Sequence, residues 1–412
     1  MANSKLGQLK RKWKNLFHVM RPVDLWHLVL ILVSCPIGLV LRLFKKHIWI
    51  VSEMENTARD NGYWFFKYLR ENYPDWPVYY PIQFDSMDYP KVSQLGNVIR
   101  HGSFKHHVYT WAAELDISAR TGRGLPARLM SHLFQKKGLY PFKEIFLQHG
   151  VIMNVTEFLK KELNNIDLFM TTTLAEAKSI HEDYHYDVEQ IPVVGLARYD
   201  QLNEFEVNPK QILLMPTWRS WLYPLFGKVT KENTQAVAES RYVKTYCDFL
   251  VSDRLNHFLE ENDLQLLFFP HSQMQPFLKA FTGENCRIKI ASMDEYDVQT
   301  ALKESAFLIT DYSSINFDFA YMKKPLCYFQ FDEEEFFTRH YPQGYFSYRD
   351  HGFGAVITTE NALMDVLEQS FASGFAMEDV YQDRVDNTFL YRDGDNCKRI
   401  LQTILEYRGR IK

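Results

Sequence analysis

The segment FLITDYSSINFDFA, residues 307–320, joins a short apolar run to a helix that opens on two serines. We read Phe307–Thr310 as a buried strand, because apolar runs of this length between turn residues are typical of parallel sheets. Ser313 and Ser314 are residue types that commonly begin helices, and Asp318 lies one helical turn after Ser314 on the same side. The free N–H groups of such a helix start favour an anion. The segment therefore predicts one strand–turn–helix unit of an α/β fold, with an anion site at its turn.

The same alternation of short apolar runs and longer amphipathic runs extends over most of the chain and predicts two doubly wound domains, residues 47–205 and 206–412. The polar segment Asn203–Lys210 separates them, and a C-terminal helix is expected at about 395–408. The predicted strands are His47–Ser52, Val78–Gln83, Glu144–Gln148, Leu168–Thr172, Ile191–Gly195, Gln211–Met215, Leu264–Phe269, Ile288–Ala291, Phe307–Thr310, Leu326–Phe331 and Ala355–Ile357. Predicted helices include Ala58–Glu71, Thr245–Glu261 and Val298–Glu304.

Residues 1–46 predict contact with a membrane. Within Lys5–Met20, apolar residues recur at helical spacing and basic residues fill the other face, which is typical of a helix lying at a lipid surface. The apolar stretch Leu28–Leu41 follows, but it is shorter than the ~20 residues of a spanning helix, and a proline and a glycine interrupt it. We expect a monotopic anchor on the cytoplasmic leaflet. The alternative is a buried helix of the first domain.

The overall composition is that of an ordinary globular protein. Of 412 residues, 46% are hydrophobic and 24% are charged, which excludes a disordered chain. The net charge of −4 argues against a general nucleic-acid binder. The five cysteines are odd in number and form no CxxC pair, so a disulfide scaffold or structural zinc site is not expected, and a reducing cytosolic setting fits.

Polar residues follow three further predicted strands, where ligands of parallel sheets bind. His149 and Gly150 follow one strand, and an exposed imidazole with an ordinary pKa near 6.5 suits a general base. Thr217 and Arg219 follow another and offer a hydroxyl and a planar donor group for phosphate. His271 follows a third. Taken singly, each of these also fits a structural histidine or a surface turn.

Common phosphate-loop and metal-site motifs are missing from the sequence. It contains no Walker A loop, GxGxxG, HExxH or CxxC, so phosphate is expected to be held by hydroxyls, Arg, His and a helix start. The histidines of IRHGSFKHH, residues 99–107, could contact an anionic acceptor or form a solvated basic loop.

Together, these segments resemble the CDP-glycerol glycerophosphotransferase family of teichoic-acid and related cell-surface polymer enzymes. The resemblance covers roughly residues 47–405. It rests on LQHG at 147–150, MPTWR at 215–219, FPH at 269–271, TDYSS at 310–314 with Phe317-Asp318, and FLYRDGDNCKR at 389–399. ARDNGY at 58–63 is also similar to smaller members of the family.

The resemblance implies a GT-B fold, in which two Rossmann-like domains face a cleft, and a monotopic enzyme at the cytoplasmic face of the membrane. The implied donor is CDP-glycerol or a related CDP-polyol such as CDP-ribitol, and the implied acceptor is a lipid-linked glycan or polymer end. His149 would be the general base, and CMP would leave. The implied donor-binding residues are Thr217, Arg219, His271, Ser313, Ser314 and Asp318, with Asp311 and Gly150 in support.

No cofactor and no tightly bound metal is implied, although a loosely bound Mg²⁺ remains open. Two other readings also stay open at this point. One is a GT-B glycosyltransferase that uses a nucleotide sugar, and the other is a membrane-bound scaffold without activity. The sequence does not choose between glycerol and ribitol, between priming, extending and decorating a polymer, or between oligomeric states.

Overall fold

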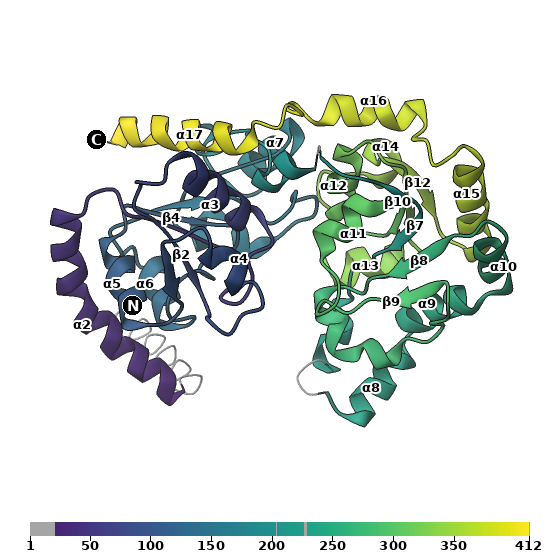
Figure 1. The fold of residues 1–412 in the computed structure, drawn as a ribbon, viewed down its shortest axis with the longest axis horizontal. Coiled ribbons are helices and arrows are strands. Elements are labelled where there is room, and N and C mark those ends of the chain that lie inside the picture. The colour runs from purple at the N-terminus through teal and green to yellow at the C-terminus, as the bar shows by residue number, and fades with distance from the viewer. Residues whose placement is uncertain (1–20, 203, 226–228, 412) are drawn as a thin grey trace, which may run out of the picture. The chain divides into compact units, whose positions relative to one another are not determined.

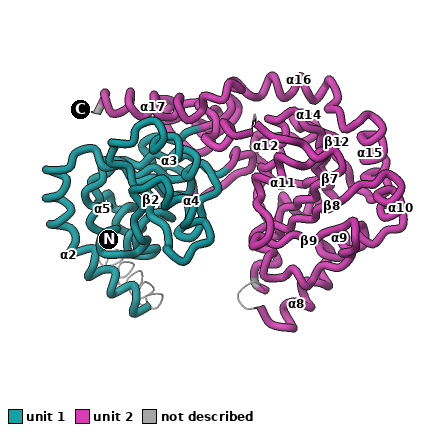
Figure 2. The backbone as a smooth tube through the Cα atoms, in the orientation of Figure 1, with its two compact units in different colours: residues 1–149, 159–170 teal, residues 150–158, 171–412 magenta. Residues whose placement is uncertain are grey.

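The computed structural model describes residues 21–202, 204–225 and 229–411, so the predicted amphipathic segment Lys5–Met20 lies outside the described residues. The chain forms two compact units (Figures 1 and 2). Unit 1 contains residues 1–149 and 159–170, and unit 2 contains residues 150–158 and 171–412. The predicted boundary at residue 205 is later than this division, because residues 171–202 pack with the second unit.

Unit 1 is built on a six-stranded parallel sheet with the order β3-β2-β1-β4-β5-β6. Its strands are β1 (Trp49–Ser52), β2 (Val78–Ile82), β3 (Val98–Arg100), β4 (Leu115–Ser118), β5 (Lys143–Phe146) and β6 (Ile166–Phe169). The helices of this unit are α2 (Pro22–Phe44), α3 (Asn61–Asn72), α4 (Tyr89–Ser93), α5 (Phe104–Ala112) and α6 (Met130–Lys136). Two short 3₁₀ turns, η1 (Glu157–Leu159) and η2 (Lys161–Leu163), precede β6.

Unit 2 is built on a second six-stranded parallel sheet with the order β12-β11-β10-β7-β8-β9. Its strands are β7 (Asn208–Leu214), β8 (Gln265–Phe268), β9 (Ile288–Ile290), β10 (Ser305–Thr310), β11 (Leu326–Phe329) and β12 (Gly354–Ile357). Its helices are α7 (Leu174–Glu182), α8 (Lys231–Ala238), α9 (Arg241–Val251), α10 (Asp253–Glu261), α11 (Val298–Glu304), α12 (Ile315–Tyr321), α13 (Glu333–Arg339), α14 (Tyr348–His351), α15 (Glu360–Ala372), α16 (Asp379–Thr388) and α17 (Asn396–Ile411). The 3₁₀ turns are η3 (Val188–Gln190), η4 (Ala197–Gln201), η5 (Ser220–Leu225) and η6 (Ser272–Ala280).

The apolar runs form central strands because both faces of the sheet are covered. In β7, Ile212 and Leu214 pack into one apolar cluster of unit 2, whereas Leu213 packs into a second cluster. Successive side chains of a strand point to opposite faces, so each face of this sheet has its own core. The α/β class with two doubly wound sheets, as predicted, is confirmed.

Several predicted elements differ in detail. Ile191–Gly195 forms no named strand, and its Val193 makes only an isolated bridge to Thr171. Strands β3 and β4 were not predicted, since β3 is three residues long and β4 carries the charged residue Asp116 in its middle. The predicted helix Thr245–Glu261 is divided into α9 and α10 at Ser252.

The N-terminal apolar helix α2 is present and is longer than predicted. It contains 23 residues, or about 34 Å at 1.5 Å per residue, and continues through Pro36 and Gly38, so the predicted interruption is wrong. By length and composition it is apolar enough to cross a membrane. Gly38 packs closely on α5, where an added Cβ would lie 2.4 Å from the Cβ of Trp111. The indole N–H of Trp111 also donates to the carbonyl of Ile31 at 3.0 Å.

One face of α2 therefore packs on unit 1, and the remaining face stays exposed. A helix held against α5 at residues 31, 38 and 42 lies along its unit instead of standing away from it. Its exposed large apolar side chains are Val23, Leu25, Trp26, Val29, Leu32, Val33, Ile37, Leu39, Val40, Leu43 and Phe44.

Candidate functional site

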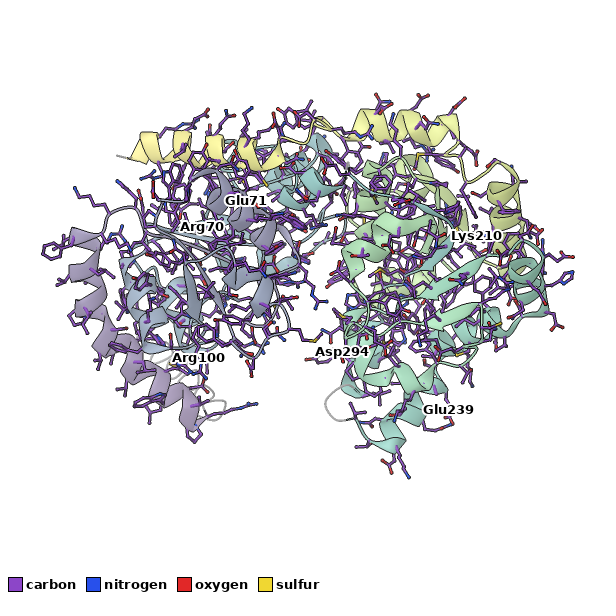
Figure 3. The ribbon with its side chains drawn as sticks, viewed as in Figure 1. Arg70, Glu71, Arg100, Lys210, Glu239 and Asp294 are labelled. Atoms are coloured by element: carbon purple, nitrogen blue, oxygen red, sulfur yellow. The ribbon has the colours of Figure 1, made fainter. Side chains whose placement is uncertain are left out.

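Both sheets reverse their strand order once, and these reversals mark the two best places for a ligand. The reversal lies between β1 and β4 in unit 1 and between β7 and β10 in unit 2. Ligands of open parallel sheets bind outside the carboxyl ends of the strands at such a point. In Figure 3, Asp294, which follows β9, marks the edge of unit 2 at which the strands end. Lys210, near the amino end of β7, marks the edge at which the strands begin.

Three hydroxyl groups lie at the reversal in unit 2. Thr217 follows β7, and its backbone N–H donates to Oδ1 of Asp311 at 2.7 Å. The Thr217 hydroxyl is buried and has no hydrogen-bond partner among the described residues. Ser313 and Ser314 follow β10 and are half-buried. Ser314 is the N-cap residue of α12, as expected, but its side chain makes no capping hydrogen bond, so its hydroxyl is not used by the helix.

Arg219 follows β7, as predicted, and its side chain is turned inward. Its side chain is fully buried, with Nε and Nη2 donating to the two carboxylate oxygens of Asp332 at 2.7 and 2.9 Å. Nη1 donates to Oδ2 of Asp311 at 2.9 Å and to the carbonyl of Thr217 at 2.6 Å. Burial alone would lower the pKa of Arg219, but these two carboxylates raise it well above its ordinary value. The guanidinium of Arg219 is therefore used by Asp332, Asp311 and the Thr217 carbonyl, and its contact with the donor stays a prediction.

Asp318 is likewise turned inward. Its oxygens accept hydrogen bonds from Nε and Nη2 of Arg198 at 2.6 and 2.8 Å, and both side chains are buried. Both carboxylate oxygens of Asp318 are thus used by Arg198, and its contact with the donor stays a prediction. Arg198, on η4, was missed because no strand end or motif marks it in the sequence.

Gly150 lies directly against Ser314. A Cβ added to Gly150 would come within 2.6 Å of the Ser314 hydroxyl oxygen and 3.9 Å of Nη2 of Arg198. Only glycine allows this approach without moving the serine. Gly150, which was predicted as a supporting residue, thus lies next to the hydroxyl of Ser314, a candidate donor-binding group.

His271 follows β8 and is half-buried. Its Nδ1 accepts a hydrogen bond from the backbone N–H of Gln273 at 3.2 Å, so the proton of the neutral ring lies on Nε2. The ring stacks on Trp218, with centroids 6.3 Å apart and an angle of 26° between the planes. Nε2–H is the donor atom of the neutral His271 ring.

His340 is a second histidine of this region, and the sequence did not indicate it. Its Nδ1 accepts from the backbone N–H of Ser220 at 2.9 Å, and its ring lies 4.8 Å from the ring of Trp218. Burial lowers its pKa to about 3, with smaller contributions from the nearby Arg219 and His271. The neutral ring therefore carries a proton on Nε2, and this buried nitrogen has no partner among the described residues.

His149 follows β5 and is exposed, on a turn with an unusual backbone. Gln148 has φ +62°, a left-handed conformation that is uncommon for a residue other than glycine. Two hydrogen bonds hold it there: Nδ2 of Asn61 donates to the Gln148 carbonyl at 2.8 Å, and Nε2 of Gln148 donates to the carbonyl of Met170 at 2.5 Å. The position of His149 is thus fixed by two flanking elements, α3 and β6.

Glu53 orders the loop that carries Asn61. Its carboxylate accepts backbone N–H groups from Arg59 at 3.0 Å and from Asp60 and Tyr63 at 2.7 Å. Burial and the Asp60 carboxylate raise the pKa of Glu53 to about 8, and the three backbone donors oppose this shift.

Among the residues that the structure describes, no group of three or more His, Cys, Asp or Glu side chains could hold a metal ion.

Comparisons with known proteins agree on one family. The profile of the CDP-glycerol:poly(glycerophosphate) glycerophosphotransferase family matches residues 35–406. Minor teichoic acid biosynthesis protein GgaB of Bacillus subtilis is 33% identical over 366 residues, which are 88% of this chain and 40% of GgaB. The ribitol-phosphate polymerase TarK of Staphylococcus aureus is 28% identical over 56% of this chain and 42% of its own length. The chain thus spans less than half of these two relatives.

Solved structures show the same fold. The wall teichoic acid polymerase TagF superimposes with a TM-score of 0.61 at 17% identity, covering 94% of this chain and 98% of that one. S. aureus MnaA with UDP gives a TM-score of 0.53 at 14% identity, covering 88% and 97%. The likeness to TagF identifies the two sheets as a GT-B fold. From the extent of the family match, this chain belongs to the CDP-glycerol:poly(glycerophosphate) glycerophosphotransferase family.

Proposed function

We propose that this chain transfers glycerol phosphate, or a related polyol phosphate such as ribitol phosphate, from its CDP-linked form to an acceptor hydroxyl and releases CMP. The acceptor is a lipid-linked glycan or a growing polymer of the teichoic-acid type. Family membership supports the reaction class, and relatives are named as glycerol-phosphate and ribitol-phosphate polymerases. One TagF histidine variant was solved after a soak with CDPG.

The observation that carries this proposal is the group of hydroxyls at the β7–β10 reversal. Thr217, Ser313 and Ser314 follow two adjacent strands, at the place where parallel sheets bind nucleotides. Hydroxyls and the Nε2–H of His271 can donate to the oxygens of a diphosphate. Phosphoryl transfer needs positioning and stabilisation of charge on those oxygens rather than a covalent nucleophile.

Arg219 and Asp318 act as positioning residues in this proposal. The guanidinium of Arg219 joins the turn after β7 to Asp311, at the end of β10. The Asp318 carboxylate fixes α12, whose preceding residue is Ser314. Both side chains therefore set the geometry of the hydroxyls without touching the donor.

His149 takes the acceptor's proton. The acceptor oxygen then forms a bond to the donor's β-phosphorus, and the bond from that phosphorus to the bridging oxygen breaks, so that CMP carries away the electron pair. His149 is exposed, and its position is fixed through Gln148 and Asn61. The strand-end position of His149, on a turn held by these hydrogen bonds, supports its assignment as the base.

The exposed apolar face of α2 supports attachment to the membrane. Exposure of so many large apolar side chains to water is unfavourable. Helices with such a face commonly bury it in the lipid interface. Because the helix lies along unit 1, we assign it an in-plane position on the cytoplasmic leaflet, where a CDP-linked donor is available. A lipid-linked acceptor would be met at the same surface.

The test is mass spectrometry of the products formed by the full chain with CDP-glycerol or CDP-ribitol and a lipid-linked acceptor. We expect a mass gain of one polyol phosphate together with CMP. His149→Ala should lower turnover by about 10²–10⁴-fold while donor affinity, measured by calorimetry, stays close to that of the wild type. UDP-sugars form the comparison arm, since MnaA with UDP shares the fold. A product that gains a sugar, or a His149→Ala variant with normal turnover, would contradict the proposal.

A further inference from the structure

We propose that residues 119–128, ARTGRGLPAR, form a binding site for the phosphate or diphosphate group of the acceptor. We call this segment the arginine loop, after Arg120, Arg123 and Arg128. The proposal rests on the proposed transferase function and adds a site for the second substrate. It concerns unit 1 alone, whereas the donor hydroxyls belong to unit 2.

The arginine loop follows β4 and therefore lies at the strand-order reversal of unit 1, between β1 and β4. This is the counterpart of the place where Thr217 and Ser314 lie in unit 2. The loop also neighbours the turn of His149: Ser118 pairs with Phe146 in register, and the N–H of Leu147 donates to the Ser118 carbonyl at 2.9 Å. The loop and the proposed base thus leave adjacent parallel strands at one edge.

The three arginines lack the partners that buried arginines of this protein have. Arg198 and Arg219 are each held by carboxylates. For Arg120, Arg123 and Arg128, no ion pair or side-chain hydrogen bond occurs within the described part of the chain. Burial lowers the pKa of Arg123, as do the charges of Arg128 and Arg120, while the carboxylate of Glu55 opposes the shift. Like charges gathered at a half-buried position are unfavourable in the free protein, and an anion would relieve this repulsion.

The backbone of the arginine loop is fixed before any ligand arrives. Gly122 has φ +66°, and a Cβ on Gly124 would lie 1.8 Å from the hydroxyl oxygen of Ser52, so the loop is pressed against the end of β1. The hydroxyl of Ser118 donates to the Arg120 carbonyl at 2.6 Å. Guanidinium groups on a fixed loop bind phosphate oxygens with a smaller loss of entropy than groups on a mobile one.

The arginine loop is also tied to the elements that hold the membrane helix. His101 Nε2 and the Leu125 carbonyl lie 3.0 Å apart, which places the start of α5 against the loop. His107, on α5, has its Nε2 3.1 Å from Nδ1 of His27 on α2. A phosphate group that heads a lipid chain could therefore meet the loop while the chain follows the apolar face of α2. This placement favours an acceptor phosphate over a soluble anion.

Binding to the full chain in detergent micelles tests the proposal, with farnesyl diphosphate as the probe and farnesol as its uncharged counterpart. The main variant is Arg120→Gln/Arg128→Gln, since both side chains are exposed and their loss should not disturb folding. The half-buried Arg123→Gln is the second variant. The control is Lys136→Gln/Lys137→Gln, which removes two exposed charges at the end of α6, the opposite edge of the same sheet.

We expect the arginine pair variant to weaken farnesyl diphosphate binding at least about tenfold, because charge-assisted contacts to phosphate are lost. Binding of farnesol and of CDP-glycerol should stay unchanged, and the lysine control should behave like the wild type. Unchanged farnesyl diphosphate binding in the pair variant and in Arg123→Gln would overturn the proposal. An equal loss of CDP-glycerol affinity would also overturn it, since the loop would then serve the donor.

Bilayer phospholipids are the other source of phosphate, and vesicles of phosphatidylcholine with phosphatidylglycerol separate the two. Loss of vesicle binding in step with loss of farnesyl diphosphate binding would assign the loop to bilayer headgroups and overturn the proposal. Retained vesicle binding supports it. If CDP-glycerol gives no transfer while diphosphate binding still depends on the arginines, the proposed function fails and the site itself stands.

Discussion

The carboxylate of Asp318 and the guanidinium of Arg198 meet through two hydrogen bonds, of 2.6 and 2.8 Å, although the residues lie 120 positions apart. Asp318 is 1% exposed and Arg198 4%. Two residues after Arg198, the carboxylate of Asp200 accepts the backbone N–H groups of Asn396 and Cys397 at 2.8 Å each, at the start of α17. Helices α12 and α17 are thus joined through η4, and this connection sets the position of Ser314.

Removing one partner of this pair should destabilise the protein strongly. We expect Asp318→Ala to lower the free energy of unfolding by about 3–5 kcal/mol, because it leaves the buried charge of Arg198 without a counterion. The double variant Arg198→Met/Asp318→Leu should recover most of that loss, since neither charge remains. Urea unfolding followed by circular dichroism measures both. If Asp318→Ala left the free energy of unfolding unchanged and weakened donor binding, Asp318 would instead contact the donor directly.

Arg219 and Thr217 should differ in which property they affect. Arg219→Ala should lower the free energy of unfolding by about 3–5 kcal/mol, because Asp311 and Asp332 lose their shared buried partner. Thr217→Val keeps the shape of the side chain and removes only the unpartnered hydroxyl. It should leave stability within about 0.5 kcal/mol and weaken CDP-donor binding by about 0.5–1.5 kcal/mol. Calorimetry and urea unfolding on the same preparations measure both properties. If Arg219 contacted the donor, Arg219→Ala would instead weaken CDP-donor binding and leave the free energy of unfolding nearly unchanged.

Two buried carboxyl groups should make the protein less stable as the pH rises. Asp116 on β4 and Glu144 on β5 are register partners, and both are buried. Burial raises the pKa of Asp116 from 3.8 to about 7, and burial together with Asp116 raises that of Glu144 from 4.5 to about 8. Because the folded state binds these protons more tightly, their contribution to stability is complete below about pH 4 and is lost as the pH rises towards 8.

Asp116→Asn tests this pH dependence, because the amide keeps the shape and does not ionise. At pH 8 it should raise the free energy of unfolding by up to about 4 kcal/mol relative to the wild type, because burial raises the pKa of Asp116 from 3.8 to about 7. Near pH 4 the two proteins should be alike. Thermal unfolding across this pH range checks the slope. An equal effect of the substitution at both ends would show that Asp116 is already ionised in the folded state.

The exposed face of α2 should control attachment to lipid. Leu32→Ser/Val40→Ser removes two apolar side chains that are 58% and 53% exposed, and it leaves the packing of Gly38 on α5 intact. We expect partitioning to vesicles of phosphatidylcholine and phosphatidylglycerol to fall about tenfold or more, because each buried side chain of this size contributes about 1.5–3 kcal/mol. The control Leu139→Ser/Leu174→Ser changes two exposed leucines outside α2. Equal loss in the control would point to general surface hydrophobicity rather than α2.

Much of the fold could be predicted from local pattern. Runs such as Leu213–Met215 and Phe307–Ile309 are apolar at every position, which is typical of a strand that is covered on both faces of the sheet. The prediction failed where the local signal conflicts with the fold. Asp116 breaks the apolar pattern of β4, yet the strand is buried at every position, with Asp116 beside Glu144 of β5.

The candidate site divides in the same way. The sequence by itself determined which polar residues follow strands, because parallel strands end at a common edge: Thr217, Ser313, Ser314, His149 and His271 all lie there in their units. Tertiary structure alone decided which charged side chains remain available. Arg219 is used by Asp332, 113 residues away, and by Asp311, and Asp318 is used by Arg198, whereas the arginine loop has no ion pair with any residue that the structure describes. Such pairings join segments that are distant in the chain. The local sequence pattern therefore cannot predict which carboxylate will pair with which guanidinium.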